Sequence, residues 1–169
     1  MKKKNISSTG HYICGLANRM NKFGAKQIAW IIPVAYLFHL TDEYFTGYPD
    51  WFSQLFKVDL SLNNFIIINS IGFTATILIA ILYSFNKINS FVVAVLGMLF
   101  FVNGLVHIAA TVFTFSYSPG TITGLSFYLP LSYLVYKNIF PLLPENQRSL
   151  SVVVGISVQI IVAMIASSI

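Results

Sequence analysis

Residues 28–45 have the sequence Ile28-Ala-Trp-Ile-Ile-Pro-Val-Ala-Tyr-Leu-Phe-His-Leu-Thr-Asp-Glu-Tyr-Phe45, an apolar run that ends in three titratable side chains. His39, Asp42 and Glu43 are spaced by three and four residues, so on a helix both carboxylates lie on the side of the imidazole. An ionisable group at the centre of a membrane helix costs about 2.5–3.5 kcal/mol. Three of them in one apolar segment therefore indicate a functional site.

The composition is that of an integral membrane protein. Hydrophobic residues make up 56% of the 169 residues and charged residues only 9%, which leaves too little polar surface for a water-soluble globule. The net charge of +5 is concentrated near the N-terminus, and a basic cluster beside an apolar helix is typical of a cytoplasmic membrane-surface anchor. We therefore expect the lipid bilayer as a partner, and no nucleic acid. Cys14 is the only cysteine, which excludes an intrachain disulfide and a cysteine-rich metal site.

Five segments approach the length of about 20 apolar residues that a membrane-spanning helix needs. They are Gln27–Thr46, Asn63–Phe85, Ser90–Phe115, Thr121–Phe140 and Leu150–Ile169. We expect an all-α fold in which residues 27–169 form a single domain, a bundle of five transmembrane helices. Residues 1–26 are expected to form a basic tail with an amphipathic helix that lies on the membrane surface.

The positions of the basic residues predict the orientation. Lysine and arginine lie mainly in the N-terminal tail, in the turn at Lys87 and in the connection from Lys137 to Arg148, which alternate correctly for one cytoplasmic side. The predicted topology is a multi-pass protein of the cell membrane with the N-terminus in the cytoplasm and the C-terminus outside. Aromatic and aliphatic residues between positions 51 and 56 then favour a short interfacial helix at the outer face.

Polar residues of different segments are expected to lie at similar depths in the bilayer. At 1.5 Å per residue, His39 lies about 10 Å below the outer end of the first segment, and His107 about 12 Å below the outer end of the third. Asn69 reaches a similar level in the second segment, and Asn103 lies one helical turn below His107. With Tyr128 on the fourth segment, four helices are predicted to contribute to one polar site in the outer leaflet.

The connection Phe115–Thr123 is predicted to lie above this site as a short lid. It contains Pro119-Gly120, which is a turn signal. The residues expected to contact a substrate are Asn69, Tyr117, Thr123 and Tyr128.

Four motifs, taken together and in order, resemble the bacterial HXXEE-motif membrane proteins. They are His39-Leu-Thr-Asp42-Glu43, Tyr48-Pro-Asp-Trp-Phe52, Asn103-x-x-x-His107 and Tyr117-Ser-Pro-Gly-x-x-Thr123. The resemblance covers most of the chain and implies a five-helix membrane protein that acts as an enzyme, although the family has no settled reaction. Its first acidic position is normally Glu, whereas this chain has the shorter Asp42.

Two kinds of chemistry fit these residues. Imidazoles and carboxylates kept from water can hold a proton donor and an acceptor at the same pH, with His39 and Glu43 as the acid/base pair. Alternatively His39, Glu43 (or Asp42) and His107 form a two-histidine, one-carboxylate set suited to zinc or non-haem iron. The sequence lacks the motifs of serine hydrolases, zincins and nucleotide-driven proteins.

The leading hypothesis is a small membrane enzyme that acts on an apolar or lipid-like substrate from the outer leaflet. His39, Asp42, Glu43, Asn103 and His107 are the candidate catalytic residues. The alternative is a non-catalytic membrane protein, either a proton-coupled small transporter or a subunit that binds a ligand or partner. A purely structural interpretation also exists, because asparagine and histidine commonly join membrane helices through hydrogen bonds.

Overall fold

The computed structural model describes the backbone of residues 7–168 and the side chains of residues 24–168. Within this range every regular element is helical and no strand occurs, which confirms the all-α prediction. The elements are α1 (Ser7–Phe45), α2 (Tyr48–Phe56), α3 (Leu62–Ser84), α4 (Ser90–Thr114), α5 (Thr121–Thr123), the π-helix η1 (Gly124–Tyr128), α6 (Leu129–Asn138), the 3₁₀ helix η2 (Phe140–Leu142) and α7 (Glu145–Ser168).

Three of the described helices, α3, α4 and α7, are long and apolar enough to cross a membrane. They correspond to the second, third and fifth predicted segments. The start of α4 is set by the Asn89 side chain, which accepts a hydrogen bond from the backbone N–H of Phe91 at 3.0 Å. The α7 helix begins at Glu145 rather than at the predicted Leu150, because the carbonyl of Pro144 already accepts bonds from the N–H groups of residues 147 and 148.

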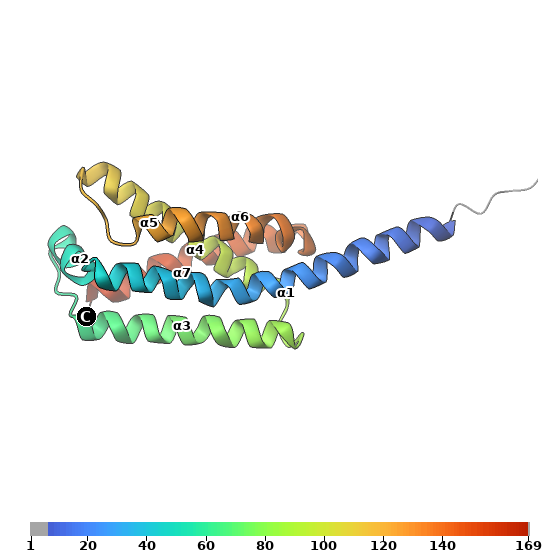
Figure 1. The fold of residues 1–169 in the computed structure, drawn as a ribbon, viewed down its shortest axis with the longest axis horizontal. Coiled ribbons are helices and arrows are strands. Elements are labelled where there is room, and N and C mark those ends of the chain that lie inside the picture. Colours follow the sequence, from blue (N-terminus) through green and yellow to red (C-terminus); the bar gives the residue numbers. More distant parts are fainter. Residues whose placement is uncertain (1–6, 169) are drawn as a thin grey trace, which may run out of the picture.

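The first predicted segment differs from expectation in two ways. It is the C-terminal half of α1, a continuous helix of 39 residues, so no break separates it from the expected surface helix. Figure 1 shows the N-terminal part of α1 projecting beyond the bundle. The predicted basic tail lies partly in residues 1–6, outside the described range. The helix α1 is not one of the three helices that are long and apolar enough to cross a membrane. Its apolar run is limited by Lys26 at one end and by His39, Asp42 and Glu43 at the other.

The fourth predicted segment, Thr121–Phe140, is divided into α5, η1, α6 and η2, none of which alone is long enough to cross a membrane. Proline explains much of this division. Pro130 has no N–H to donate to the preceding turn, and that turn is the π-helix η1. The expected five spanning helices are therefore confirmed by length and composition for three segments only.

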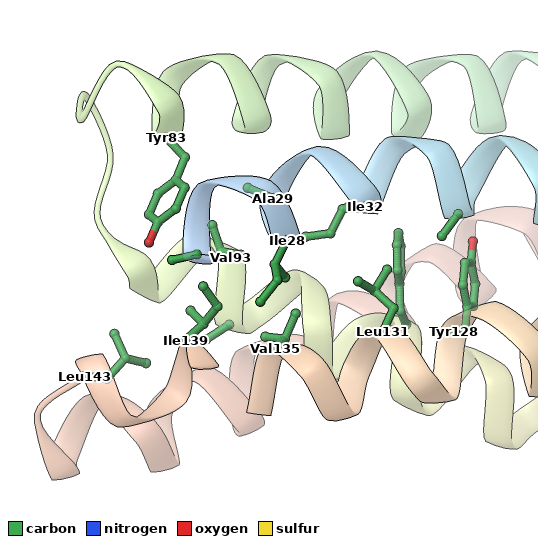
Figure 2. Close-up of a cluster of buried hydrophobic side chains, with 14 residues drawn as sticks. Ile28, Ala29, Ile32, Tyr83, Val93, Tyr128, Leu131, Val135, Ile139 and Leu143 are labelled. Atoms are coloured by element: carbon green, nitrogen blue, oxygen red, sulfur yellow. The ribbon is translucent and has the colours of Figure 1, made fainter. Parts of the chain in front are cut away.

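Buried side chains from several helices form the main hydrophobic core. Figure 2 shows α1, the end of α3, α4 and α6 contributing to it. The labelled members are Ile28, Ala29, Ile32, Tyr83, Val93, Tyr128, Leu131, Val135, Ile139 and Leu143. The core runs along the inner side of α1, so the half of α1 that carries His39 and Glu43 is held in place by packing.

The outer surface of the bundle is largely apolar. Large hydrophobic side chains such as Ile71 on α3 and Met164 on α7 are about two-thirds exposed, as expected for helices whose outer faces contact lipid. The predicted interfacial helix is confirmed as a helix, α2. Its Phe52 is buried against Leu60 and Phe65 in a second, smaller hydrophobic cluster.

Candidate metal centre

Two turns of α1 and one turn of α4 bring three buried polar side chains together. His39 and Glu43 lie four residues apart on α1, and His107 lies on α4. The side chains converge on one carboxylate oxygen: Glu43 Oε1 is 3.4 Å from His39 Nε2 and 3.3 Å from His107 Nε2. The three residues are at most 5% exposed. The predicted proximity of His39 and His107 is thus confirmed, with ring centroids 5.0 Å apart.

The connection between α4 and η1, residues 115–123, covers this centre, and we call it the strap. Its hydroxyl groups hold the far side of both imidazoles: Thr123 Oγ1 lies 2.8 Å from His39 Nδ1, and Ser118 Oγ lies 3.3 Å from His107 Nδ1. Thr111 on α4 fixes the strap, because its hydroxyl accepts a bond from the Ser118 N–H at 3.0 Å. Each histidine therefore has its Nδ1 atom engaged and its Nε2 atom directed at Glu43.

Gly120 lets the strap approach both imidazoles. Its φ of +90° lies in the left-handed region, which glycine adopts without strain. A Cβ atom at this position would lie 2.8 Å from His39 Cε1, closer than real Cβ atoms come to their neighbours, and 3.0 Å from His107 Cε1, which is tighter than most real contacts. The predicted turn at Pro119-Gly120 is therefore also a site of close contact.

Asp42 lies apart from the three converging residues. Its Oδ2 accepts bonds from Thr123 Oγ1 at 2.8 Å and from the Thr123 N–H at 3.2 Å. Its Oδ1 accepts a bond from the Tyr117 hydroxyl at 3.1 Å. Asp42 therefore ties α1 to the strap, and the described hydrogen bonds link it to His39 through Thr123.

The remaining predicted residues surround the centre at different distances. Tyr128 packs against His39, with ring centroids 4.2 Å apart. Asn69 accepts a bond from the Tyr36 hydroxyl at 2.9 Å. Asn103 lies one turn from His107 on α4, and its buried Oδ1 has no hydrogen-bond partner within the described part of the chain. No hydrogen bond is described between any of these three side chains and His39, Glu43 or His107.

No role was predicted from the sequence for Ser118 or Tyr48. Ser118 is fully buried, and Tyr48 lies beside His107 with ring centroids 5.7 Å apart. Both stand within motifs quoted above, but their roles depend on contacts between segments far apart in the sequence. Burial raises the pKa of the Tyr48 hydroxyl, with a smaller effect from the Glu43 carboxylate, so it is a protonated donor at neutral pH.

Tyr117 is partly exposed, and its hydroxyl keeps its proton for a similar reason. Its partial burial and the neighbouring Asp42 carboxylate both raise the pKa of its hydroxyl. The hydroxyl therefore remains a donor to Asp42 across the physiological pH range.

The distances between the three side chains distinguish two ways of balancing the charge of the Glu43 carboxylate: hydrogen bonds from protonated imidazoles, or a bound metal ion. A charge-assisted hydrogen bond between a protonated imidazole and a carboxylate is about 2.7–2.9 Å long, shorter than the 3.3 and 3.4 Å observed. Ligand atoms about 2.05 Å from a tetrahedral zinc ion lie about 3.3 Å from one another. One ligand atom from each of His39, Glu43 and His107 fits within a span of 4.8 Å. The donor set and its spacing therefore suit a divalent transition metal.

Comparison with known proteins identifies a family. The model of a family described as "Protein of unknown function with HXXEE motif" matches residues 30–135. This range contains α2, α3, α4 and the strap, and all the residues described above as forming or surrounding the centre. No curated protein and no solved structure matches the chain.

Proposed function

The chain belongs to the HXXEE family of proteins of unknown function, and we propose that it is a five-span membrane enzyme with a metal centre. In this proposal His39, Glu43 and His107 bind a divalent transition metal, zinc or iron. The substrate is apolar or lipid-like and enters from the bilayer.

The C-terminal half of α1 is proposed as one of the two additional spans. From Lys26 to Phe45 this helix is 20 residues long, which corresponds to about 30 Å and matches the hydrocarbon core of a bilayer. Its outward-facing side chains are apolar, including Ile31, Val34 and Phe38. His39 and Glu43 are buried, so they do not meet lipid.

The interrupted segment from α5 to α6 is proposed as the second additional membrane span. It contains no charged residue from Thr121 to Tyr136, and Ile122 and Leu125 are exposed along its outer side. The π-helix does not exclude a span, because irregular helical backbone is tolerated in membranes where neighbouring helices cover it. Gly124 of η1 lies directly against Gly104 of α4.

The orientation follows from the two ends of the bundle. Lys26 lies near the end of α3, where its ammonium donates to the Ser84 carbonyl at 2.7 Å, and Lys87 follows in the next turn. Asp50 and Asp59 lie at the opposite end, in and after α2. A basic end indicates the cytoplasmic side, so we place the metal centre in the outer half of the cell membrane.

Reporter fusions test this topology. A reporter placed after Lys87 or after Arg148 is expected to be cytoplasmic, and one placed after Ile169 is expected to be outside, because positively charged connections stay in the cytoplasm. Paired phosphatase and fluorescent-protein fusions measure this. A cytoplasmic reporter after Ile169 would contradict five spans, since an even number of crossings returns the chain to its starting side.

The observation that supports a metal is the spacing of the three ligand atoms. Two Nε2 atoms face the same carboxylate oxygen at 3.3 and 3.4 Å, too far for charge-assisted hydrogen bonds, and the Nε2 of His39 has no hydrogen-bond partner in the described range. A buried polar atom without a partner is costly. A cation between the three atoms would satisfy all of them at once.

Such a centre suits metal-assisted chemistry. A bound zinc or iron ion with open positions supplies a Lewis acid or an activated water. The chain adds a buried amide oxygen on Asn103, able to accept a hydrogen bond from a substrate. Tyr128 adds an aromatic wall, stacked on Phe100 with ring centroids 4.3 Å apart, which favours an apolar substrate.

Comparison of membrane lipids tests whether the protein is an enzyme. Cells that produce the wild-type chain and cells that produce Glu43→Gln are expected to differ in at least one apolar or lipid species, because the amide keeps the shape of Glu43 but removes its charge and proton-accepting ability. Mass spectrometry of total lipid extracts, at matched protein levels, makes the comparison. Identical extracts, together with metal-dependent uptake of a solute into vesicles, would contradict an enzyme acting on lipids and favour a transporter.

A further inference from the structure

Asp42 is a charged residue next to a proposed metal ligand, yet its carboxylate faces the strap. We infer that Asp42 is a positioning residue, which acts through Thr123 to hold the imidazole of His39 in the tautomer whose Nε2 is free to bind a cation. This inference rests on the proposed metal centre. It adds a role for Asp42 that requires no contact with metal or substrate.

The hydrogen atoms around Thr123 determine the tautomer. The Thr123 hydroxyl has one proton and lies near three groups: Asp42 Oδ2 at 2.8 Å, the Gly120 carbonyl oxygen at 3.2 Å and His39 Nδ1 at 2.8 Å. The first two can only accept, and the ionised carboxylate is the closer and stronger acceptor. The hydroxyl proton is therefore directed away from His39.

With its proton engaged, the Thr123 oxygen presents a lone pair to His39. The 2.8 Å contact is then a hydrogen bond that His39 Nδ1–H donates. A neutral imidazole carries one proton, so Nε2 is left with its lone pair exposed toward Glu43. This is the form of histidine that binds a metal through Nε2, and a carboxylate behind the imidazole commonly stabilises it.

The remaining contacts of Asp42 keep this arrangement in place. The Thr123 N–H and the Tyr117 hydroxyl both donate to the carboxylate, so three donors fix its orientation. Asp42 thus joins the strap to α1 at the residue that holds His39. Removing the carboxylate leaves two described acceptors for the Thr123 proton, the Gly120 carbonyl at 3.2 Å and His39 Nδ1 itself at 2.8 Å, and donation to Nδ1 selects the other tautomer.

A double-mutant cycle on cobalt binding tests the inference. Asp42→Ala and Thr123→Val are each expected to weaken Co²⁺ binding about 10–100-fold, the usual effect of losing a group that orients a metal ligand. If Asp42 acts through Thr123, the double variant is no weaker than the worse single variant. Titration of purified protein in detergent, followed by the visible absorption of bound Co²⁺, measures the affinities. Asp50→Ala, which removes an exposed carboxylate of α2, is the matched control and should bind as the wild type does.

The tautomer itself is measured without metal. The chain has three histidines, so ¹⁵N-histidine labelling gives a simple NMR spectrum in which His11→Ala and His107→Ala variants identify the His39 signals. In wild-type protein the proton of neutral His39 is expected on Nδ1, and in Thr123→Val a population with the proton on Nε2 should appear. Asp42→Glu, which keeps a carboxylate, should retain both the tautomer and the Co²⁺ affinity.

The possible results separate this inference from the proposed function. Additive losses in the double variant, or an Asp42→Ala variant that binds Co²⁺ as well as Asp50→Ala does, would overturn the role of Asp42 while leaving the metal centre intact. A wild-type protein that binds no Co²⁺ would overturn the proposed function, and the NMR spectrum would still decide the tautomer. A proton on Nε2 of His39 in wild-type protein would overturn the inference by itself.

Discussion

His39→Ala, His107→Ala and Glu43→Gln are each expected to lose stoichiometric metal, with affinity falling more than about 100-fold, beyond the range seen when an outer group is removed. Each change takes away one of only three protein ligands, and a pair of ligands rarely holds a divalent ion at a protein site. Elemental analysis of purified protein, combined with Co²⁺ titration, measures the loss.

Matched controls exist for both residue types. His11→Ala removes the third histidine of the chain, and Glu145→Gln changes an exposed carboxylate at the start of α7. Both controls are expected to keep the metal. Retention of metal by all three ligand variants, with the fold intact by circular dichroism, would show that the ion binds elsewhere.

Gly120→Ala is expected to disrupt the centre from the strap side. Alanine in a left-handed conformation costs about 1–2 kcal/mol, and its Cβ would lie 2.8 and 3.0 Å from the Cε1 atoms of His39 and His107. The two imidazoles or the strap must move, so we expect metal affinity to fall about as far as in the ligand variants. Thermal unfolding in detergent and Co²⁺ titration measure the two effects.

Gly47→Ala separates strain from contact. Gly47 also has a positive φ, +77°, but a Cβ there would meet nothing within 4 Å. The two alanine variants should lose similar stability from the backbone, and only Gly120→Ala should lose the metal. Equal metal binding by both variants would mean that the strap does not press on the imidazoles.

The centre was largely predictable because its residues are costly in an apolar helix. His39 and Glu43 stand out in a run of hydrophobic residues, and the 1.5 Å rise per residue relates the depth of His39 to that of His107. This estimate needed no knowledge of how the helices pack. The structure confirms that the two histidines meet, at a ring separation of 5.0 Å.

Other parts of the site depend on contacts that sequence spacing does not reveal. Asp42 and Glu43 are adjacent, and from the sequence alone both are candidates for the carboxylate of the centre. One residue on a helix is a rotation of about 100°, and this turns Asp42 toward Thr123, 81 positions away in the chain. The role of Ser118 depends in the same way on where the strap crosses α4.

The fold shows the same division between local and long-range information. The apolar lengths of α3, α4 and α7 follow from composition and were predicted with small errors at most ends. The π-helix η1 was not predicted, although Pro130 is a visible signal of an interruption. A continuous α1 was also not predicted, because the amphipathic pattern before residue 27 and the apolar pattern after it were interpreted as two separate elements, whereas the helix runs through both.

X-ray absorption spectroscopy of protein purified from membranes and reconstituted with zinc or iron determines whether His39, Glu43 and His107 bind a metal ion. We expect about one ion per chain, bound by nitrogen and oxygen at about 2.0–2.2 Å with the scattering pattern of two imidazoles. Glu43→Gln should lose this signal. Protein that holds no stoichiometric ion after reconstitution, or an ion with a sulfur ligand at about 2.3 Å, would contradict a centre formed by His39, Glu43 and His107.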